Sequence, residues 1–207
     1  MNEQAYTPTF ISTGPFHHFN KDFQTLENYH KSVIARANVK LENLVCIIRD
    51  NEENIRSFYA ETVLGRLHDN DFVKMILTDS IFILEHFLRN YYRLWESDDP
   101  KVADQWMTPL LMLDLVLLEN QLPFFVLETV FTLAFPSPSK KFPSLIQLTF
   151  LYFDCFNVQD ITPIEVKIEH FTDLVRTFQP PPILSLTGDK LMWKNFGILK
   201  WIWLRLE

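Results

Sequence analysis

Apolar side chains recur along most of this chain at the three- and four-residue spacing that is typical of α-helices. The pattern predicts long helices over residues 22–38, 41–63 and 71–95, and shorter helices over residues 145–156 and 162–178. Glycine is scarce, with 4 residues in a chain of 207, which favours helices over tight hairpins. The sequence therefore predicts an all-α fold, an irregular bundle of several helices.

The densest apolar run covers residues 113–131 and predicts the central element of the bundle. It is apolar on opposite sides of a helix, which is typical of a helix that is buried. Thr108 followed by Pro109 indicates the start of this helix. Pro123 disfavours helical geometry at the residue before it, so we expect the helix to end or kink there and a second helix to follow, from residue 124 onwards.

Three polar residues, Glu119, Asn120 and Gln121, occupy the predicted break. Buried polar groups in proteins are nearly always hydrogen-bonded, so we expect these side chains to satisfy the backbone groups that the break frees. The alternative is a catalytic Glu119, because a buried carboxylate often has a raised pKa. No neighbouring residue in the sequence supplies a partner for that role.

Two further carboxylates belong to the predicted helix over residues 71–95. Asp79 falls in its apolar stripe, where we expect a core carboxylate that is paired with an arginine or with a helix N-terminus. The functional alternative is a site acid, and an enzyme would then need a pocket lined by Asp79 and Glu119 together. Glu85 is predicted on the polar face, four residues before Arg89, which is the favourable order for a helical ion pair.

The predicted helical domain, residues 21–178, is flanked by two segments of different character. Residues 1–20 have no periodicity and predict an extended arm on the surface. Residues 179–207 combine a proline-rich spacer with a tail whose fold the pattern does not assign. The tail places three tryptophans near lysines and an arginine, a mixture that suits a membrane interface or a helix that docks on a partner. Alternatively, it belongs to a larger core.

Charge and composition argue against several classes of function. The formal net charge is −7, and residues 51–135 hold 14 acidic and 6 basic residues, which disfavours binding to nucleic acid. The four glycines are scattered, so the sequence has no phosphate-cradling loop. It contains no recognisable hydrolase or metalloprotease motif either. We therefore expect no enzymatic activity, no cofactor and no small-molecule substrate.

The cysteines and histidines form no metal or redox motif. Cys46 and Cys155 lie far apart without CxxC spacing, so they are predicted to be buried, reduced thiols, and a disulfide between them is the disfavoured alternative. His17 and His18 are adjacent and cannot easily share one metal ion, and the sequence offers no third ligand close by. We expect both histidines to pack against a helix from the surface arm.

Four segments carry longer motifs: GPFHH at residues 14–18, RSFYAE at 56–61, DFVKMILTDSIFILEHF at 71–87 and DLVLLENQLPFFVL at 114–127. They resemble the motifs of the plant family known as domain of unknown function 247, and the last of them is long and specific. The resemblance extends over about residues 8–178.

The resemblance marks a set of signature residues, which we expect to be structural. They are Gly14, Pro15, His17, His18, Tyr59, Glu61, Asp71, Phe72, Asp79, Glu85, Asp114, Leu118, Glu119, Asn120, Gln121, Pro123 and Phe124. The chain departs from the family pattern at Ser80, where glycine is usual, and over residues 183–207, which follow the family's next block only faintly.

Membership of this family would imply a longer protein with a membrane anchor. Its members are about twice as long and end in a transmembrane helix, whereas this chain has no sufficiently long uncharged apolar run and no secretory signal. We therefore expect a C-terminally truncated member, from a truncated gene model, a splice form or a degenerate copy, that is cytoplasmic as given.

The family has been linked to plant reproduction, including self-incompatibility and sex determination, and it supplies no catalytic residue to carry over. The favoured hypothesis is a non-enzymatic, plant-specific interaction or signalling module with a protein partner. The alternatives are a peripheral membrane protein that acts through the tryptophan-rich tail, and an enzyme of unknown class that uses Asp79 and Glu119.

Deleting residues 183–207 should improve solubility and leave the helical content of the remaining chain mostly intact. The reason is that the tail's large apolar side chains would form an exposed patch if no core receives them. Circular dichroism and size-exclusion chromatography of the two chains would measure this. Unfolding of the shortened chain would instead assign the tail to the core.

Overall fold

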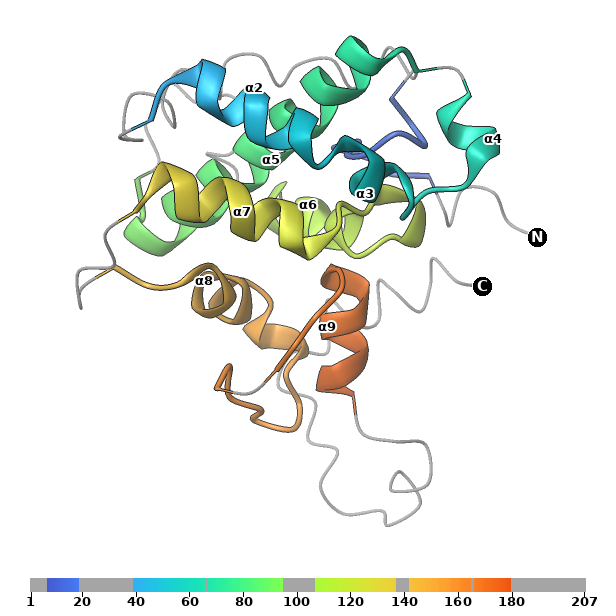
Figure 1. Ribbon diagram of the computed structural model, residues 1–207. Helices are drawn as coiled ribbons and strands as arrows, with labels where there is room; N and C mark the ends of the chain where they lie inside the picture. Colours follow the sequence, from blue (N-terminus) through green and yellow to red (C-terminus); the bar gives the residue numbers. More distant parts are fainter. Residues whose placement is uncertain are drawn as a thin grey trace.

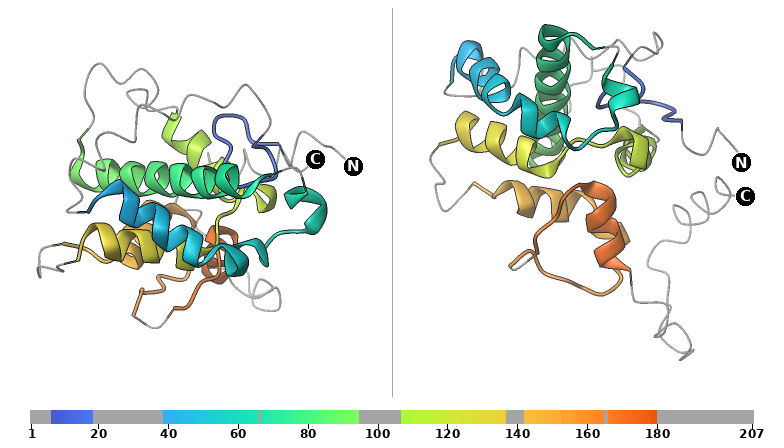
Figure 2. Two further views of the ribbon diagram at one scale, coloured as in Figure 1. Left: turned by 45° about the horizontal axis from the view of Figure 1, so that its top comes forward. Right: turned by 45° about the vertical axis from the view of Figure 1, so that its right-hand side comes forward.

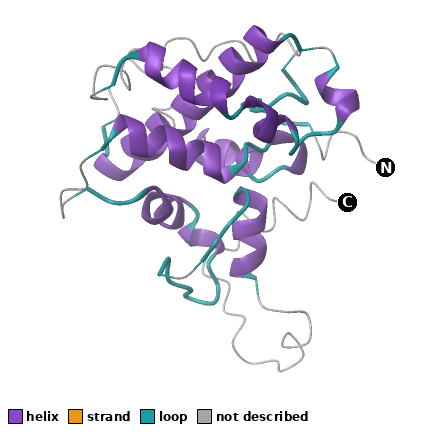
Figure 3. Cartoon of the chain, in the orientation of Figure 1, coloured by secondary structure: helices purple, strands orange, loops and turns teal. Residues whose placement is uncertain are grey.

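The computed structural model describes residues 7–18, 39–65, 67–94, 107–136, 142–164 and 166–179. Within these ranges every regular element is a helix, as Figures 1 and 3 show, so the predicted all-α class is confirmed. The predicted helix over residues 22–38 and the tail over residues 183–207 lie outside the described residues.

The longest helix, α5 (Asp69–Tyr92), packs against three others: α2 (Leu41–Asp50), α7 (Phe124–Ala134) and α8 (Leu145–Tyr152). Figure 2 shows α5 running beside α2 and α7, with α8 on the side of α7 away from α2. Most of its side chains are buried, which explains why its apolar residues extend around the helix rather than along one stripe. Helix α5 ends at Arg93, which has the left-handed conformation common at helix C-termini.

The helix predicted over residues 41–63 is three shorter helices: α2, α3 (Glu52–Arg56) and α4 (Glu61–Leu64). The first break is at Asn51, whose side-chain amide donates to the carbonyl of Ile47 at 2.8 Å. A polar side chain that hydrogen-bonds to the nearby backbone competes with continuation of the helix. The spacing of apolar residues does not report this effect, so the break was not predicted.

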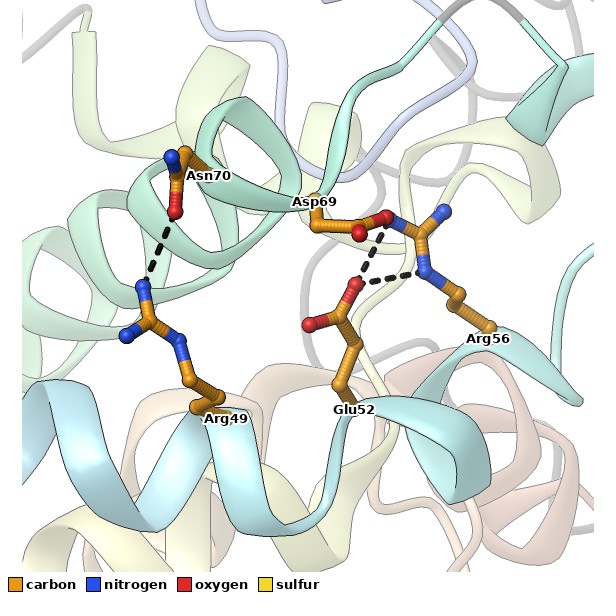
Figure 4. A network of polar contacts seen from close by, with 5 residues as sticks. All are labelled: Arg49, Glu52, Arg56, Asp69 and Asn70. Atoms are coloured by element: carbon orange, nitrogen blue, oxygen red, sulfur yellow. Dashed lines mark hydrogen bonds and ion pairs between the residues drawn. The ribbon is translucent and has the colours of Figure 1, made fainter.

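Polar contacts join this broken segment to the start of α5 (Figure 4). Arg49 donates to Asn70 at 2.9 Å, and Arg56 forms ion pairs with Glu52 at 2.7 Å and with Asp69 at 3.2 Å. The contacts of Asn70 and Asp69 are exposed and contribute little to stability, whereas the pair of Arg56 with Glu52 is partly buried.

Helix α8 begins with a capping box. The hydroxyl of Ser144 accepts from the backbone N–H of Gln147, and the side chain of Gln147 accepts from the backbone N–H of Ser144. A short 3-10 helix, η5 (Asp154–Phe156), follows it. The helix predicted over residues 145–156 is therefore present with a change of type near its end.

Helix α9 (Phe171–Phe178) is shorter than the helix predicted over residues 162–178, because residues 162–164 and 166–170 are not helical. His170 is its N-cap, and Nδ1 of this histidine accepts from the backbone N–H of Asp173 at 3.1 Å. The helix therefore begins directly after His170, a residue that the apolar spacing had placed inside it.

An aromatic cluster joins α5, the end of α8, the residue that follows α8, and α9 in the core. The ring of Phe87 on α5 lies 4.6 Å from Tyr152, 6.1 Å from Phe153 and 5.5 Å from Phe171, measured between centroids. All four side chains are buried. Such pairs stabilise a core beyond their buried area, so this cluster holds the second half of the chain on α5.

Phe87→Ala should lower the free energy of unfolding by about 3–5 kcal/mol, because it opens a cavity where α5, α8 and α9 meet. Urea unfolding followed by circular dichroism measures the change. Tyr91→Ala is the control on the same helix, since Tyr91 is an exposed side chain, and it should cost much less. Equal losses in the two variants would contradict the assigned role of the cluster.

Candidate functional site

The N-terminal arm is not a surface strap, and in this respect the sequence-based prediction was wrong. The arm is irregular as expected, but residues 11–15 are buried. Figure 2 shows the arm lying close to one end of α5. A buried irregular segment needs partners for its backbone groups. The signature side chains provide these partners.

Asp114 holds the first part of the arm. Its carboxylate is fully buried and accepts the backbone N–H groups of three successive residues, Thr9 at 2.9 Å, Phe10 at 2.5 Å and Ile11 at 3.0 Å. Hydrogen bonds to an ionised acceptor are shorter and stronger than neutral ones. One side chain thus replaces the neighbouring strand or helical turn that would normally satisfy these donors.

Asn120 holds the next part of the arm. Its Oδ1 accepts the N–H of Thr13 at 2.5 Å, and its Nδ2 donates to the carbonyls of Ile11 and Asp114, both at 2.9 Å. The hydroxyl of Thr13 also donates to the backbone carbonyl of Asn120 at 2.7 Å. Both polar ends of this buried amide are therefore satisfied. Thr13 is a member of the site that the sequence analysis did not single out.

Gln121 connects the centre of the chain to its C-terminal helix. Its Nε2 donates to the carbonyls of Leu115 at 2.7 Å and Leu117 at 2.5 Å, and its Oε1 accepts the N–H of Phe171 at 3.1 Å. Its backbone carbonyl accepts the hydroxyl of Tyr59 at 3.1 Å. A single residue thereby satisfies groups at the end of α6, at the start of α9 and on the segment before α4.

These contacts explain why the break in the central run lies earlier than predicted. Helix α6 (Met107–Leu115) ends at Leu115 rather than at Leu122, and a 3-10 turn, η4 (Leu118–Asn120), follows. The chain bends by 97° at this junction. The side-chain amides of Asn120 and Gln121 donate hydrogen bonds to the backbone carbonyls that are left unpaired where α6 ends. Pro123 marks the start of α7, not the end of α6.

Asp79 lies beside the arm at Gly14 and not at an arginine or a helix N-terminus, as had been expected. Its Oδ2 accepts the N–H of Gly14 at 2.8 Å. Burial raises the pKa of Asp79 to about 8, although the hydrogen bond from Gly14 opposes the shift. Burial, and then the negative charge of Asp79, raises the pKa of Tyr59 well above its ordinary value.

Gly14 is required at this point by its backbone. Its φ is +74°, and a Cβ atom there would lie 2.9 Å from the carbonyl oxygen of Gln121. The left-handed conformation costs other residues free energy, and the close approach leaves no room for a methyl group. The turn at Gly14 places its N–H on Asp79.

Glu119 does not satisfy the backbone at the break, so this part of the prediction was wrong. Its Oε2 is shielded from solvent and accepts no hydrogen bond. The residue lines a groove of about 370 Å³. The other lining residues are Phe16, Phe58, Tyr59, Ala60, Val63, Leu118, Gln121, Pro123 and His170. Asp79 is not among them, so the structure does not bring Asp79 and Glu119 to one pocket.

Glu85 is buried rather than exposed on a polar face, since α5 is covered on nearly all sides. It forms the predicted pair with Arg89, whose Nε lies 2.6 Å from its Oε1. Phe72 is buried under Arg56, whose guanidinium carbon lies 4.1 Å from the ring centroid. Both are core contacts of α5.

The remaining signature residues lie around this network. Glu61 begins α4 and is exposed, Pro15 is buried, and Phe124 donates its N–H to the carbonyl of Glu169 at 2.7 Å. The ring of His17 lies 4.8 Å from that of Phe16, measured between centroids.

His18 lies in the fields of Asp71 and Lys74 on α5. Burial lowers the pKa of His18, the carboxylate of Asp71 opposes this change, and the ammonium of Lys74 adds to it. The second histidine of the arm thus lies near α5.

Among the residues that the structure describes, no three histidine, cysteine, aspartate or glutamate side chains are grouped closely enough to hold a metal ion. Both cysteines are free thiols. Cys46 is exposed, which contradicts the predicted burial, whereas Cys155 is half-buried with its sulfur 3.4 Å from that of Met112. Burial raises the pKa of Cys155 to about 11, so this thiol stays protonated at neutral pH.

Comparison with known proteins identifies the family. The profile of the family DUF247, described as plant protein of unknown function, matches residues 1–190. The chain belongs to this family. The predicted family membership is therefore confirmed. In this member the signature residues Gly14, Tyr59, Asp79, Asp114, Asn120 and Gln121 form the network around the arm.

Two proteins of Arabidopsis thaliana are similar to this DUF247 member. The UPF0481 protein At3g47200 is 32% identical over 138 residues, which is 63% of this chain and 28% of the relative. The putative UPF0481 protein At3g02645 is 28% identical over 182 residues, which is 84% of this chain and 32% of the relative. The matched part thus spans about a third of each relative's length. No solved structure matches this chain.

In the described part of the chain, no single helix has the length and apolar character needed to cross a membrane. Two segments, Thr108–Leu115 and Leu118–Ala134, meet those criteria only when taken together across their 97° bend.

Gly14→Ala should lower the free energy of unfolding by at least about 1 kcal/mol, because alanine is strained at positive φ and its methyl group would meet the carbonyl of Gln121. Thermal unfolding measures the effect. Gly65→Ala is the matched control, because an added Cβ there would meet its nearest neighbour only at 3.5 Å. A Gly14→Ala protein as stable as the parent would contradict the proposed packing of the arm.

Asp79→Asn should remove one component of the pH dependence of stability. The folded protein holds the Asp79 proton up to a pKa of about 8, whereas the unfolded chain releases it near 3.8, so this group's contribution to stability falls as pH rises from about 4 to 8. An asparagine stays neutral, and its oxygen still accepts from Gly14. We therefore expect the variant's melting temperature to change less between pH 5 and pH 8, with its largest advantage at pH 8. Parallel curves for the two proteins would contradict a protonated Asp79.

Proposed function

We propose that this chain is a non-enzymatic interaction module, specific to plants, that binds a protein partner. The main support is that two buried carboxylates hold the backbone of the N-terminal arm. Asp114 accepts three backbone N–H groups and Asp79 accepts one, so both side chains hold the arm in place. A carboxylate that is committed to several backbone donors, as Asp114 is, is poorly suited to exchanging protons with a substrate.

The surface next to this network supplies the second support. Three large apolar side chains of the groove are exposed: Phe16 at 54%, Phe58 at 46% and Leu118 at 69%. Apolar side chains gathered around a depression favour contact with another protein. The tertiary structure brings Phe58, which lies between α3 and α4, to this surface.

The proposed role in reproductive recognition, such as self-incompatibility or sex determination, is based on the links of the family to plant reproduction. We place the action of this chain in the cytoplasm, and the same module would act at a membrane in family members that carry an anchor.

Two other functions would give different experimental results. A peripheral membrane protein that acts through residues 183–207 would bind lipid vesicles without a protein partner. An enzyme that uses Asp79 and Glu119 would need a rearrangement, since only Glu119 lines the groove.

Photo-crosslinking of the whole chain tests the proposed function. A photoreactive phenylalanine derivative would replace Phe58 in the groove in one sample and Leu151, which is 57% exposed outside this groove, in a control sample. In extracts of plant reproductive tissue, we expect defined protein adducts at position 58 that are absent at position 151. Equal adducts at both positions would contradict the proposal, and so would flotation of the unlabelled chain with lipid vesicles in the absence of protein.

A further inference from the structure

We propose that the groove lined by Tyr59, Leu118 and Glu119 binds an apolar peptide segment that carries an arginine, with the guanidinium paired to Glu119. This inference deepens the proposed function and rests on it, because it states which chemistry the protein partner presents. The argument uses the charge of the groove, the state of its carboxylate and the kind of side chain around it.

The charge of the groove is negative. Glu119 and His170 are its ionisable lining residues besides Tyr59, and Nδ1 of His170 accepts a hydrogen bond from the backbone N–H of Asp173. This contact occupies Nδ1 of His170, so that nitrogen is not available to a ligand in the groove. Burial raises the pKa of the Tyr59 hydroxyl, which therefore stays protonated at neutral pH. Glu119 is the acidic side chain on the lining of this described groove.

The immediate surroundings add to this negative charge. Glu61 directly follows the lining residue Ala60, and Glu169 directly precedes His170, and both are exposed. Lys167 lies 3.7 Å from Glu169 and offsets part of the charge on that side. A cationic group on the ligand is therefore favoured over an anionic one.

The carboxylate of Glu119 has unused hydrogen-bonding capacity. Its Oε2 is shielded from water and accepts no hydrogen bond, although Glu119 as a whole is partly exposed and lines the groove. An acceptor that is both desolvated and unsatisfied gains free energy when a donor arrives. The terminal torsion of a glutamate rotates over a broad range, so either oxygen can turn towards the groove without moving the backbone.

The apolar lining selects arginine over lysine. Aromatic rings of Phe16, Phe58 and Tyr59 line the groove together with Leu118 and Pro123. A guanidinium group is planar, is less strongly hydrated than an ammonium group, stacks on aromatic faces and can form two parallel hydrogen bonds with one carboxylate. The exposed Phe58 and Leu118 would meet the apolar residues on either side of the arginine.

Contacts within the described part of the protein fix two walls of the groove before a ligand binds. The hydroxyl of Tyr59 donates to the carbonyl of Gln121 at 3.1 Å, and the ring of Phe58 lies 5.4 Å from that of Phe125, measured between centroids. Fixing the walls in advance reduces the entropy that a ligand must remove on binding. The volume of about 370 Å³ is enough for one long side chain.

Fluorescence anisotropy with two labelled model peptides tests this inference on the whole chain. In the first peptide, one arginine is flanked by leucine and phenylalanine residues. In the second, citrulline replaces the arginine, which keeps the shape and removes the charge. We expect saturable binding of the arginine peptide and roughly tenfold weaker binding of the citrulline peptide.

Three variants locate the binding site. Glu119→Gln should abolish the preference for arginine, and Leu118→Ser should weaken the binding of both peptides. Leu151→Ser, at an exposed leucine outside the groove, should change neither. Circular dichroism establishes that each variant is folded, and Leu118 is exposed enough for its replacement to leave the core intact.

Equal affinity for the two peptides, or an arginine preference that survives in Glu119→Gln, would overturn the inference. So would a loss of binding in Leu151→Ser as large as that in Leu118→Ser. These failures are distinct from failure of the proposed function, because a protein photo-crosslinked at position 58 would still establish an interaction module whose ligand has a different chemistry.

Discussion

The arrangement of this protein depends on one buried carboxylate that holds an irregular stretch of backbone. Asp114 accepts N–H groups from three successive residues of the N-terminal arm, and this allows a segment without regular structure to enter the core. Without such an acceptor, each buried donor would cost about 1–3 kcal/mol. The arm in turn covers the side of the bundle where α5, α6 and η4 approach one another.

The other signature residues extend this interaction into a continuous network. Asn120 forms hydrogen bonds with the arm and with the end of α6, and Gln121 forms hydrogen bonds with the end of α6 and the start of α9. Asp79 accepts a hydrogen bond at the turn of Gly14. A buried polar network stabilises one arrangement strongly when its members are satisfied and destabilises it when they are not. This accounts for a set of polar residues in a chain whose other buried side chains are mostly apolar.

The groove is a consequence of the same network. Gln121 receives the hydroxyl of Tyr59, and the turn at η4 leaves Leu118 exposed while Glu119 points its Oε2 away from solvent. Residues that are close together in sequence thus divide into two roles. Asn120 and Gln121 face the interior and hold the chain, whereas Leu118 and Glu119 line the surface that we propose for a partner.

The sequence alone determined the fold class and the family of this chain. The spacing of apolar residues is a local property, so it located the long helix α5 to within a few residues and the shorter helix α8 within its predicted range. The motif DLVLLENQLPFFVL was long enough to indicate the DUF247 family, which the profile match then established. Neither result requires knowledge of which residues meet in space.

The tertiary structure decided the helix boundaries and the roles of the polar residues. Helix α6 ends at Leu115 because amides from Asn120 and Gln121 satisfy its carbonyls, and α9 starts at Phe171 because His170 caps it. The arm is buried because Asp114 supplies acceptors from about a hundred positions away in the chain. Periodicity reports which faces of a segment are apolar, but the partner of a buried hydrogen-bonding group is set by the packing of distant segments.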